Sequence, residues 1–141
     1  MTQLQALALR AKQAKKWKWM PAMRWIENRQ SPLENIVGRV EDLRPRNGSD
    51  IRPDALPDLE DPATMGCLLA LVRKAWRCPT VYVRQSGTRR ASDGILAWEV
   101  CDLWFDAEAC KALGVDQEGG VGCWGHSCEA EALVFALENA P

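Results

Sequence analysis

The chain has 141 residues, 47% of them hydrophobic, and its formal net charge at pH 7 is −1. This length and apolar content suffice for one domain with its own core, without disulfides or metals. No stretch has the length of a membrane span, so we expect no membrane segment. The first residues lack the charged head and long apolar run of a signal peptide, which predicts a cytoplasmic protein.

The first part of the chain predicts a helix followed by short strands. Thr2 can cap a helix that runs to about Lys16 with its apolar residues along one side. Residues 17–21 alternate aromatic and basic side chains, which favours an extended segment that enters a turn. A second short strand is expected at residues 36–40, followed by a long loop over about residues 44–58.

Residues 56–73 carry the clearest helix signal of the chain. Asp61 can cap the helix, and Pro62 suits its first position. Apolar residues then recur at steps of three and four, so one side of this helix is expected to be buried. The residues on this predicted face are Met65, Leu68, Leu69, Val72 and Trp76.

The remaining residues predict a β-hairpin and a last helix. Residues 80–83 and 95–104 are typical of strands joined by a polar tip at residues 85–94, and apolar residues on both faces favour a central position for the second strand. A short helix is expected at residues 106–113, and Ser127 is expected to cap the last helix. The inward residues of the last helix are expected to be Ala130, Leu133, Val134 and Leu137.

These elements predict the α+β class. Consecutive strands with short connections favour an antiparallel sheet over a doubly wound parallel sheet. We expect a single domain over residues 1–141, with two or three helices packed on one face of the sheet.

Charge is distributed unevenly along the chain. Residues 1–29 hold seven basic side chains against the single acid Glu27, whereas residues 99–141 hold nine acids against Lys111. The basic segment either binds nucleic acid or a phosphorylated ligand, or it pairs with the acidic tail of its own subunit or with that of a neighbouring subunit in a homo-oligomer. Solvated charge without a partner is the commoner outcome for such runs.

The six cysteines form no metal-binding pattern. Cys123 and Cys128 flank His126, the single histidine, but no second pair of ligands at zinc-binding spacing accompanies them. Catalysis by either thiol with His126 would need a third, orienting group. We therefore expect reduced cysteines, no bound metal and no cofactor.

The glycine-rich segment 119–125 favours an anion site. Glycines let backbone amides approach a ligand closely, and a helix N-terminus carries a partial positive charge, so a phosphate or carboxylate can bind there. The candidate residues are Gly122, Gly125, His126 and Ser127. The alternative is a strand with tight turns in which Ser127 only caps the helix, and the absence of a phosphate-loop pattern favours it.

The tryptophans divide by their neighbours in the sequence. Trp76, Trp98 and Trp104 follow apolar periodicities and are expected in the core. Trp17, Trp19 and Trp25 alternate with basic residues, a composition that can stack on a base while cations contact its phosphates. The candidate ligand-binding residues here are Trp17, Lys18, Trp19 and Arg24. Burial in a core or an interface is the alternative for this set.

Residues 17–23, 56–73 and 129–141 resemble small proteins encoded by tailed phages and prophages. The segments read WKWMPAM, LPDLEDPATMGCLLALVR and EAEALVFALENAP. The resemblance implies a phage context and the cytoplasm of the host cell, without catalytic residues to carry over. Small phage accessory proteins often act by binding, either by sequestering a host immune signal nucleotide or by blocking a host effector.

The expected function is therefore binding without catalysis. The chain would be a phage accessory protein that counteracts host defence, with a phosphorylated nucleotide-like molecule as ligand. One alternative is a protein–protein inhibitor of a host defence protein whose acidic C-terminal third mimics nucleic acid or meets a basic surface of the host protein. Another is a small enzyme that uses His126, although hydrolysis or transfer needs more positioned acid and base groups than the sequence offers.

Overall fold

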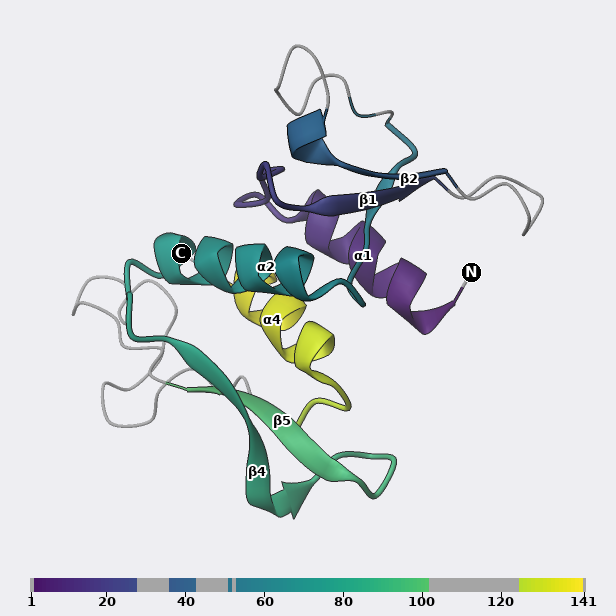
Figure 1. Cartoon of the computed structure of the whole chain (residues 1–141). Coiled ribbons are helices and arrows are strands. Elements are labelled where there is room, and N and C mark those ends of the chain that lie inside the picture. Colours follow the sequence, from purple (N-terminus) through teal and green to yellow (C-terminus); the bar gives the residue numbers. More distant parts are fainter. Residues whose placement is uncertain (1, 28–35, 43–50, 52, 102–124, 141) are drawn as a thin grey trace. The chain divides into compact units, whose positions relative to one another are not determined.

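The structure is a computed structural model that describes residues 2–27, 36–42, 51, 53–101 and 125–140 (Figure 1). The chain divides into two compact units, Met1–Leu68 and Leu69–Pro141. The described residues form three α-helices and two small antiparallel sheets, so the α+β class and the antiparallel pairing are confirmed. The extent of the single domain stays a prediction. None of the described helices has the length and apolarity needed to cross a membrane.

The first unit contains a three-stranded sheet with β1 at its centre. Strand β1 (Arg24–Glu27) pairs on one side with β2 (Ile36–Arg39) and on the other with β3 (Leu56–Pro57), antiparallel in both cases. A single 3₁₀ turn, η1 (Val40–Asp42), follows β2. The predicted strand at residues 36–40 is thus confirmed, and the end of the predicted loop supplies the edge strand β3.

The first strand lies later in the chain than the sequence predicted. Residues 17–20 belong to no strand, so the extended part of that prediction is wrong, whereas the predicted turn is present at Pro21 and Ala22. The amide of Met23 donates to the carbonyl oxygen of Met20 at 2.9 Å, which closes a turn directly before β1. Pro21 lies inside this turn, where its fixed φ suits a turn better than a sheet.

Trp25 of β1 lies opposite Gly38 of β2. A Cβ atom at position 38 would come within 2.8 Å of the Cζ2 atom of Trp25, so the indole ring covers the glycine backbone. An aromatic side chain packed across a strand glycine stabilises the pair. Trp25 therefore has a structural role in this sheet.

Helix α1 (Gln3–Gln13) begins as the sequence predicted. The Thr2 side chain accepts from the amide of Gln5, and the Gln5 side chain accepts from the amide of Thr2, which makes a complete capping box. The helix ends at Gln13, three residues before the predicted end at Lys16. Its buried residues are Leu7, Ala8 and Ala11.

Lys12 ties α1 to the chain that leads into β3. Its ammonium donates to the carbonyl oxygen of Pro53 and, at 2.9 Å, to that of Ala55. Partial burial lowers the pKa of Lys12, against the opposing charge of Asp54. The contact fixes β3 beside α1.

Helix α2 (Pro62–Ala75) has the predicted start and a slightly different buried face. Leu68, Val72 and Trp76 are buried as expected, but Met65 and Leu69 are only half-buried. Their places at the centre of the face are taken by Thr64 and Leu71. Hydropathy could not identify Thr64 as a core residue, because its burial depends on polar partners from other elements.

The buried carboxylate of Asp61 joins three elements of the first unit. One oxygen caps α2 by accepting from the amide and the hydroxyl of Thr64, each at 2.9 Å. Both oxygens also accept from the guanidinium of Arg39 in β2, at 3.0 and 3.1 Å. The Thr64 hydroxyl oxygen in turn accepts from the amide of Arg24 in β1 at 2.8 Å. These bonds hold the pKa of Asp61 well below its usual range.

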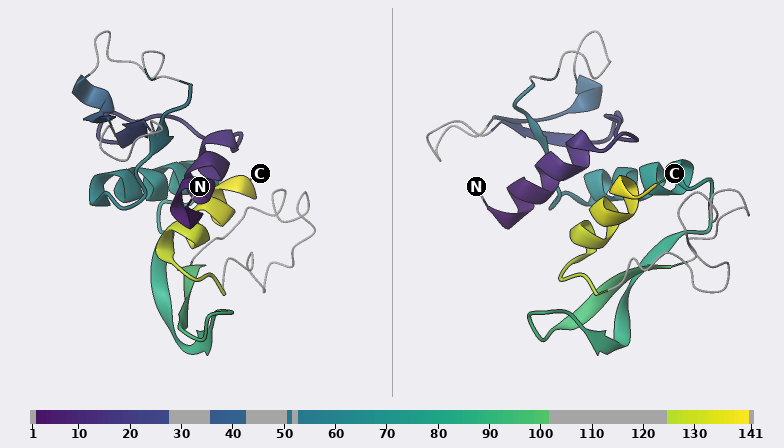
Figure 2. Two further views of the ribbon diagram at one scale, coloured as in Figure 1. Left: turned by 90° about the vertical axis from the view of Figure 1, so that its right-hand side faces the viewer. Right: turned by 180° about the vertical axis from the view of Figure 1, so that it is seen from behind.

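The second unit is built on a β-hairpin. Strands β4 (Tyr82–Arg90) and β5 (Leu96–Cys101) pair antiparallel, and helix α4 (Glu129–Glu138) contacts both of them (Figures 1 and 2). The polar tip predicted at residues 85–94 is wrong in length, because β4 continues to Arg90. The tip is a turn in which the amide of Gly94 donates to Ala91, with φ +82° at the glycine.

Helix α4 is mostly apolar and its predicted inward residues are confirmed. The indole of Trp76 donates to the carbonyl oxygen of Ala136 at 2.8 Å, which satisfies a buried donor and links the end of α2 to α4. The N-cap residue is Cys128, and its side chain makes no capping hydrogen bond, so the prediction that Ser127 caps the helix is wrong. The buried residues are Ala130, Ala132, Leu133, Val134, Ala136 and Leu137.

We predict that Leu68→Ala and Leu69→Ala differ in their effect on stability. Leu68 is fully buried and Leu69 is half-buried. Removing a buried leucine costs about 2–5 kcal/mol, so the Leu68 variant should lose that much and the Leu69 variant clearly less. Urea denaturation of both variants measures the difference. Equal losses would mean that the buried face is centred elsewhere.

The Asp61 network predicts a pH-dependent contribution to stability. A carboxyl group whose pKa is lowered by folding stabilises the protein above its unfolded pKa, near 3.9, and this contribution disappears as pH falls through the folded pKa. Asp61→Asn should therefore destabilise by about 1.5–3 kcal/mol at pH 7, and the gap to the parent protein should shrink below about pH 4. Urea titrations of both proteins at several pH values test this, and a gap independent of pH would contradict it.

Candidate functional site

The predicted aromatic site lies between α1 and β1 in the first unit. The rings of Trp17 and Trp19 meet edge to face, with centroids 5.4 Å apart and an interplanar angle of 81°. Both side chains are half-buried, and Lys15, Lys16 and Lys18 beside them are exposed. The indole nitrogen of Trp17 is buried and has no hydrogen-bond partner in the described part of the chain. The segment thus places an aromatic pair among cations, as a stacking site requires.

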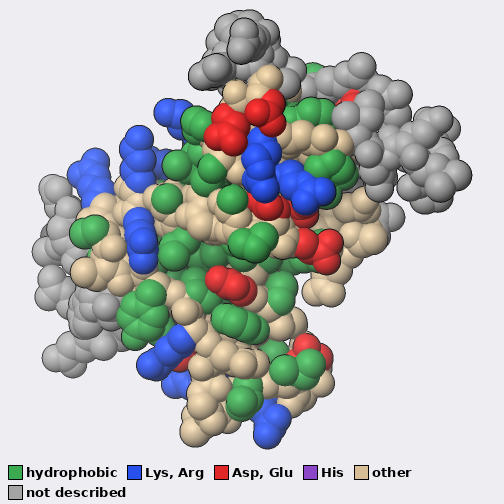
Figure 3. Space-filling model, viewed as in Figure 1, with side chains coloured by type: hydrophobic (Ala, Val, Ile, Leu, Met, Phe, Trp, Pro, Cys, Tyr) green, Lys and Arg blue, Asp and Glu red, His purple; other side chains and the backbone are tan. Residues whose placement is uncertain are grey.

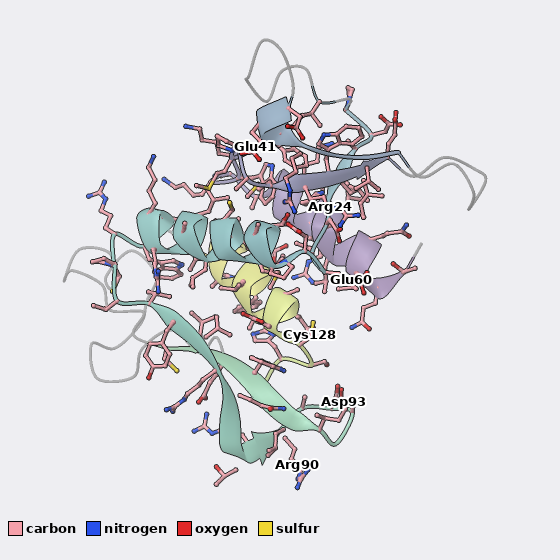
Figure 4. All side chains as sticks on the ribbon, viewed as in Figure 1. Arg24, Glu41, Glu60, Arg90, Asp93 and Cys128 are labelled. Atoms are coloured by element: carbon pink, nitrogen blue, oxygen red, sulfur yellow. The ribbon has the colours of Figure 1, made fainter. Side chains whose placement is uncertain are left out.

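Arg24, the fourth residue of that predicted set, is already paired. Its Nε atom lies 3.4 Å from a carboxylate oxygen of Asp58, whose amide donates to the Arg24 carbonyl oxygen at 2.9 Å. Acidic and basic side chains lie side by side over the strands of this unit (Figure 3), and Figure 4 labels Arg24 on β1. The charge of Arg24 is therefore largely balanced within the chain.

The predicted anion site at the start of α4 is partly occupied by the chain's own carboxylate. The amide of Ser127 donates to Oε2 of Glu131 at 2.7 Å, and the same oxygen lies 4.0 Å from Nδ1 of His126. Gly125 has φ +87°, as the predicted turn requires. Gly122 lies outside the described residues. The amide that was expected to hold a phosphate thus already holds an anion.

His126 has a structural position at the edge of the hairpin. Its backbone exchanges two hydrogen bonds with Trp98 of β5, at 2.8 and 3.2 Å, so β5 has backbone partners on both edges. Its ring lies 5.0 Å from the ring of Phe135 in α4. These contacts place the histidine between strand and helix.

The two halves of the predicted site belong to different units. Trp17, Lys18, Trp19 and Arg24 lie in Met1–Leu68, whereas Gly125, His126 and Ser127 lie in Leu69–Pro141. Their combination into one ligand site stays a prediction. Residues 102–124 lie outside the described structure, and with them most of the acidic C-terminal third, the predicted helix at 106–113, Cys110 and Cys123.

The described cysteines are Cys67, Cys78, Cys101 and Cys128, and all four are free thiols. Burial raises the pKa of Cys67, which makes its thiol less reactive. Where the structure describes the chain, no group of three or more acidic, histidine or cysteine side chains is arranged to hold a metal ion.

A cavity of about 370 Å³ opens at an irregularity of β4 that the sequence did not predict. Gln85 pairs with Trp98 and Arg90 with Leu96, so four residues of β4 lie opposite the single residue Ala97. Such a bulge bends a strand and redirects its side chains, and bulges are over-represented next to functional sites. The residues that line this bulge cavity are Arg84, Gln85, Ser86, Gly87, Thr88, Arg89 and Glu99.

Arg84 is held at the bulge cavity by one side of its guanidinium group. Its Nε atom donates to Oε1 of Glu99 at 2.6 Å, and the Arg84 side chain makes no other hydrogen bond to the described residues. The side chain is 59% exposed, whereas that of Glu99 is 15% exposed. The two Nη atoms make no hydrogen bond to another described residue, so they remain as donors.

The Ser86 hydroxyl lies inside the bulge and is fixed there by two backbone amides. The hydroxyl oxygen of Ser86, which is buried, accepts from the amides of Thr88 at 3.3 Å and Arg89 at 2.9 Å. Its own proton is left to donate. Figure 4 shows Arg90 and Asp93 at the far end of the hairpin, where Arg90 donates to the carbonyl oxygen of Gly94 at 2.8 Å.

Sequence reasoning assigned residues 85–94 to a hairpin tip and missed this cavity. The signal that could have found it is the density of cations, because Arg84, Arg89 and Arg90 fall within seven residues. The bulge itself leaves no local signature apart from Gly87. Comparison with protein-family models, with curated proteins and with solved structures finds no match to this chain.

Proposed function

We propose that the protein acts by binding, without catalysis, and that its ligand is a phosphorylated, nucleotide-like molecule. The observation that carries this proposal is the guanidinium of Arg84 at the bulge cavity, anchored through Nε and open at its two Nη atoms. Two parallel N–H donors match two oxygens of a phosphate group. Because Glu99 already holds the side chain, less conformational freedom is lost on binding.

The charges around the bulge cavity favour an anion. Arg84 and Arg89 line it against the single carboxylate of Glu99, and Arg90 follows directly in the strand. The Ser86 hydroxyl adds a neutral donor at its wall. A volume of about 370 Å³ is within the range of small-molecule sites, which favours a compact ligand over an extended surface.

The nucleotide part of the proposal rests on a separate candidate site within the first unit, the Trp17–Trp19 pair with Lys18. An aromatic pair among exposed lysines suits a base and its phosphates. The resemblance to phage accessory proteins supports a biological role, which is to sequester a nucleotide signal of host defence.

We predict that inorganic phosphate binds at the bulge cavity and that Arg84→Gln weakens this binding about tenfold or more, because a charge-assisted pair of hydrogen bonds is lost. Amide chemical-shift titration by NMR follows the binding residue by residue. Arg84→Lys keeps the charge but not the two parallel donors, so it should fall between the parent protein and Arg84→Gln.

Lys74→Gln is the matched control, because Lys74 is an exposed cation of α2 outside the bulge cavity. It should leave phosphate binding unchanged. Equal weakening by Lys74→Gln and Arg84→Gln would indicate general electrostatic attraction without a site. Shifts that do not map to residues 84–89 would contradict the proposed location.

The nucleotide proposal predicts a specific loss on Trp19→Ala. A thermal-shift screen with mono-, di- and cyclic nucleotides should find a stabilising ligand, since a ligand at 100 times its Kd stabilises the fold by about 2.7 kcal/mol. Trp19→Ala should then cost about 1–3 kcal/mol of binding free energy, measured by calorimetry. Met20→Ala, which shortens a half-buried neighbour, is the control, with circular dichroism to check folding. If no nucleotide binds the parent protein at micromolar concentration, the sequestration hypothesis fails.

A further inference from the structure

A second cavity, of about 330 Å³, lies between α1 and the edge of the three-stranded sheet. It is lined entirely by residues of the first unit, between Thr2 and Glu60. The bulge cavity lies in the second unit, and the ligand proposed for it is an anion. This α1 cavity is therefore independent of the proposed function.

The walls of the α1 cavity are apolar. Leu4 and Ala8 line it from one side of α1, and Ile26 and Leu56, which pair across β1 and β3, line it from the sheet. The anchoring of Lys12 to Pro53 and Ala55 keeps β3 at its place beside the helix. Apolar walls of this kind favour a hydrocarbon body for the ligand.

The polar edge of the α1 cavity carries carboxylates. Asp58 is nearly buried, accepts from the amide of Glu60 at 3.1 Å and lies 3.4 Å from Nε of Arg24, so its charge is balanced. Glu60 is exposed, and its carboxylate takes part in none of the ion pairs that the structure describes (Figure 4). Its negative charge is thus available to a ligand.

The side-chain oxygens of Thr2 and Gln5, which also line the α1 cavity, are already committed as acceptors. In the capping box, Oγ1 of Thr2 accepts from the amide of Gln5 at 3.1 Å and Oε1 of Gln5 accepts from the amide of Thr2 at 2.8 Å. The α1 cavity thus has apolar walls and one available carboxylate at its edge, that of Glu60. That combination attracts a cation and repels an anion.

We propose that the α1 cavity binds a hydrophobic ammonium group, that is, a hydrocarbon body in contact with Leu4, Ala8, Ile26 and Leu56 whose ammonium head pairs with Glu60. Such a group occurs on a free arylalkylamine and on a peptide with an apolar N-terminal residue. An ion pair at a partly exposed edge contributes modestly, so the discrimination between cation and anion should be about three- to fivefold.

The test is an NMR titration of the whole chain with three matched probes: phenethylamine, 2-phenylethanol and 3-phenylpropionate. Phenethylamine should shift the amides of residues 4–8, 26 and 56–60 with a Kd on the order of millimolar, the alcohol should bind more weakly and the carboxylate weakest. A tripeptide amide with N-terminal phenylalanine tests whether the ammonium group is that of a peptide N-terminus. Tighter binding of the peptide than of phenethylamine assigns the site to peptides, and the reverse order assigns it to free amines.

Glu60→Gln should remove the preference for the ammonium probe and leave the alcohol unaffected. Glu41→Gln, an exposed acid on η1 that does not line the α1 cavity, is the control and should change neither. Ala8→Leu should exclude all probes by filling the chamber. Because Ala8 is buried and this variant can fail to fold, the decision rests on Glu60→Gln and the probe order.

Two results would overturn the proposal. One is a carboxylate probe that binds as tightly as phenethylamine, or a preference that survives Glu60→Gln. The other is the absence of localised shifts with phenethylamine at about 10 mM, a concentration at which even weak fragment binding is visible. Neither result bears on phosphate binding at the bulge cavity.

Discussion

The first unit depends on one buried carboxylate, that of Asp61. A buried charge is tolerated only when its hydrogen-bonding capacity is filled, and here Thr64 and Arg39 fill it with short bonds. The carboxylate caps the start of α2 and pairs with Arg39 at the end of β2. Thr64 extends these contacts to β1, because its hydroxyl oxygen accepts from the amide of Arg24. The start of α2 is thereby fixed against the sheet. The segment Asp58–Glu60, which forms the edge of the α1 cavity, is held directly before this anchor.

The arginines of this chain differ in how much of their charge the chain itself neutralises. Arg39 meets a carboxylate through both Nη atoms, so it offers no open fork to a ligand, whereas Arg24 lies beside Asp58 through its Nε atom at 3.4 Å. Arg84 meets Glu99 through Nε alone. An ion pair through Nε orients the guanidinium group but leaves its two Nη atoms unused. The Arg84–Glu99 pair therefore favours anion binding at the bulge cavity.

At the start of α4, in contrast to the bulge cavity, a group of the chain itself already occupies the position that an anionic ligand would take. A helix N-terminus attracts an anion, and Glu131 supplies one from the first turn of the helix itself. The amide of Ser127 is satisfied before any ligand arrives. Ser127 and Glu131 are only four residues apart, so this contact is local; the sequence predicts the Ser127 side chain as the capping acceptor, whereas in the structure the Ser127 amide is the donor.

The sequence by itself determined those elements whose caps and apolar spacing depend on residues only a few positions apart. The capping box of Thr2, the Asp61–Pro62 start and the apolar stripe of α4 all depend on neighbours three or four positions away, so composition and spacing suffice. Tertiary structure decided the rest: the burial of Thr64, the bulge of β4 and the pairs Arg39–Asp61 and Arg84–Glu99. Those pairs join residues 22 and 15 positions apart, and both cavities are spaces between elements. No local pattern encodes such contacts, because they exist only once the strands and helices have packed.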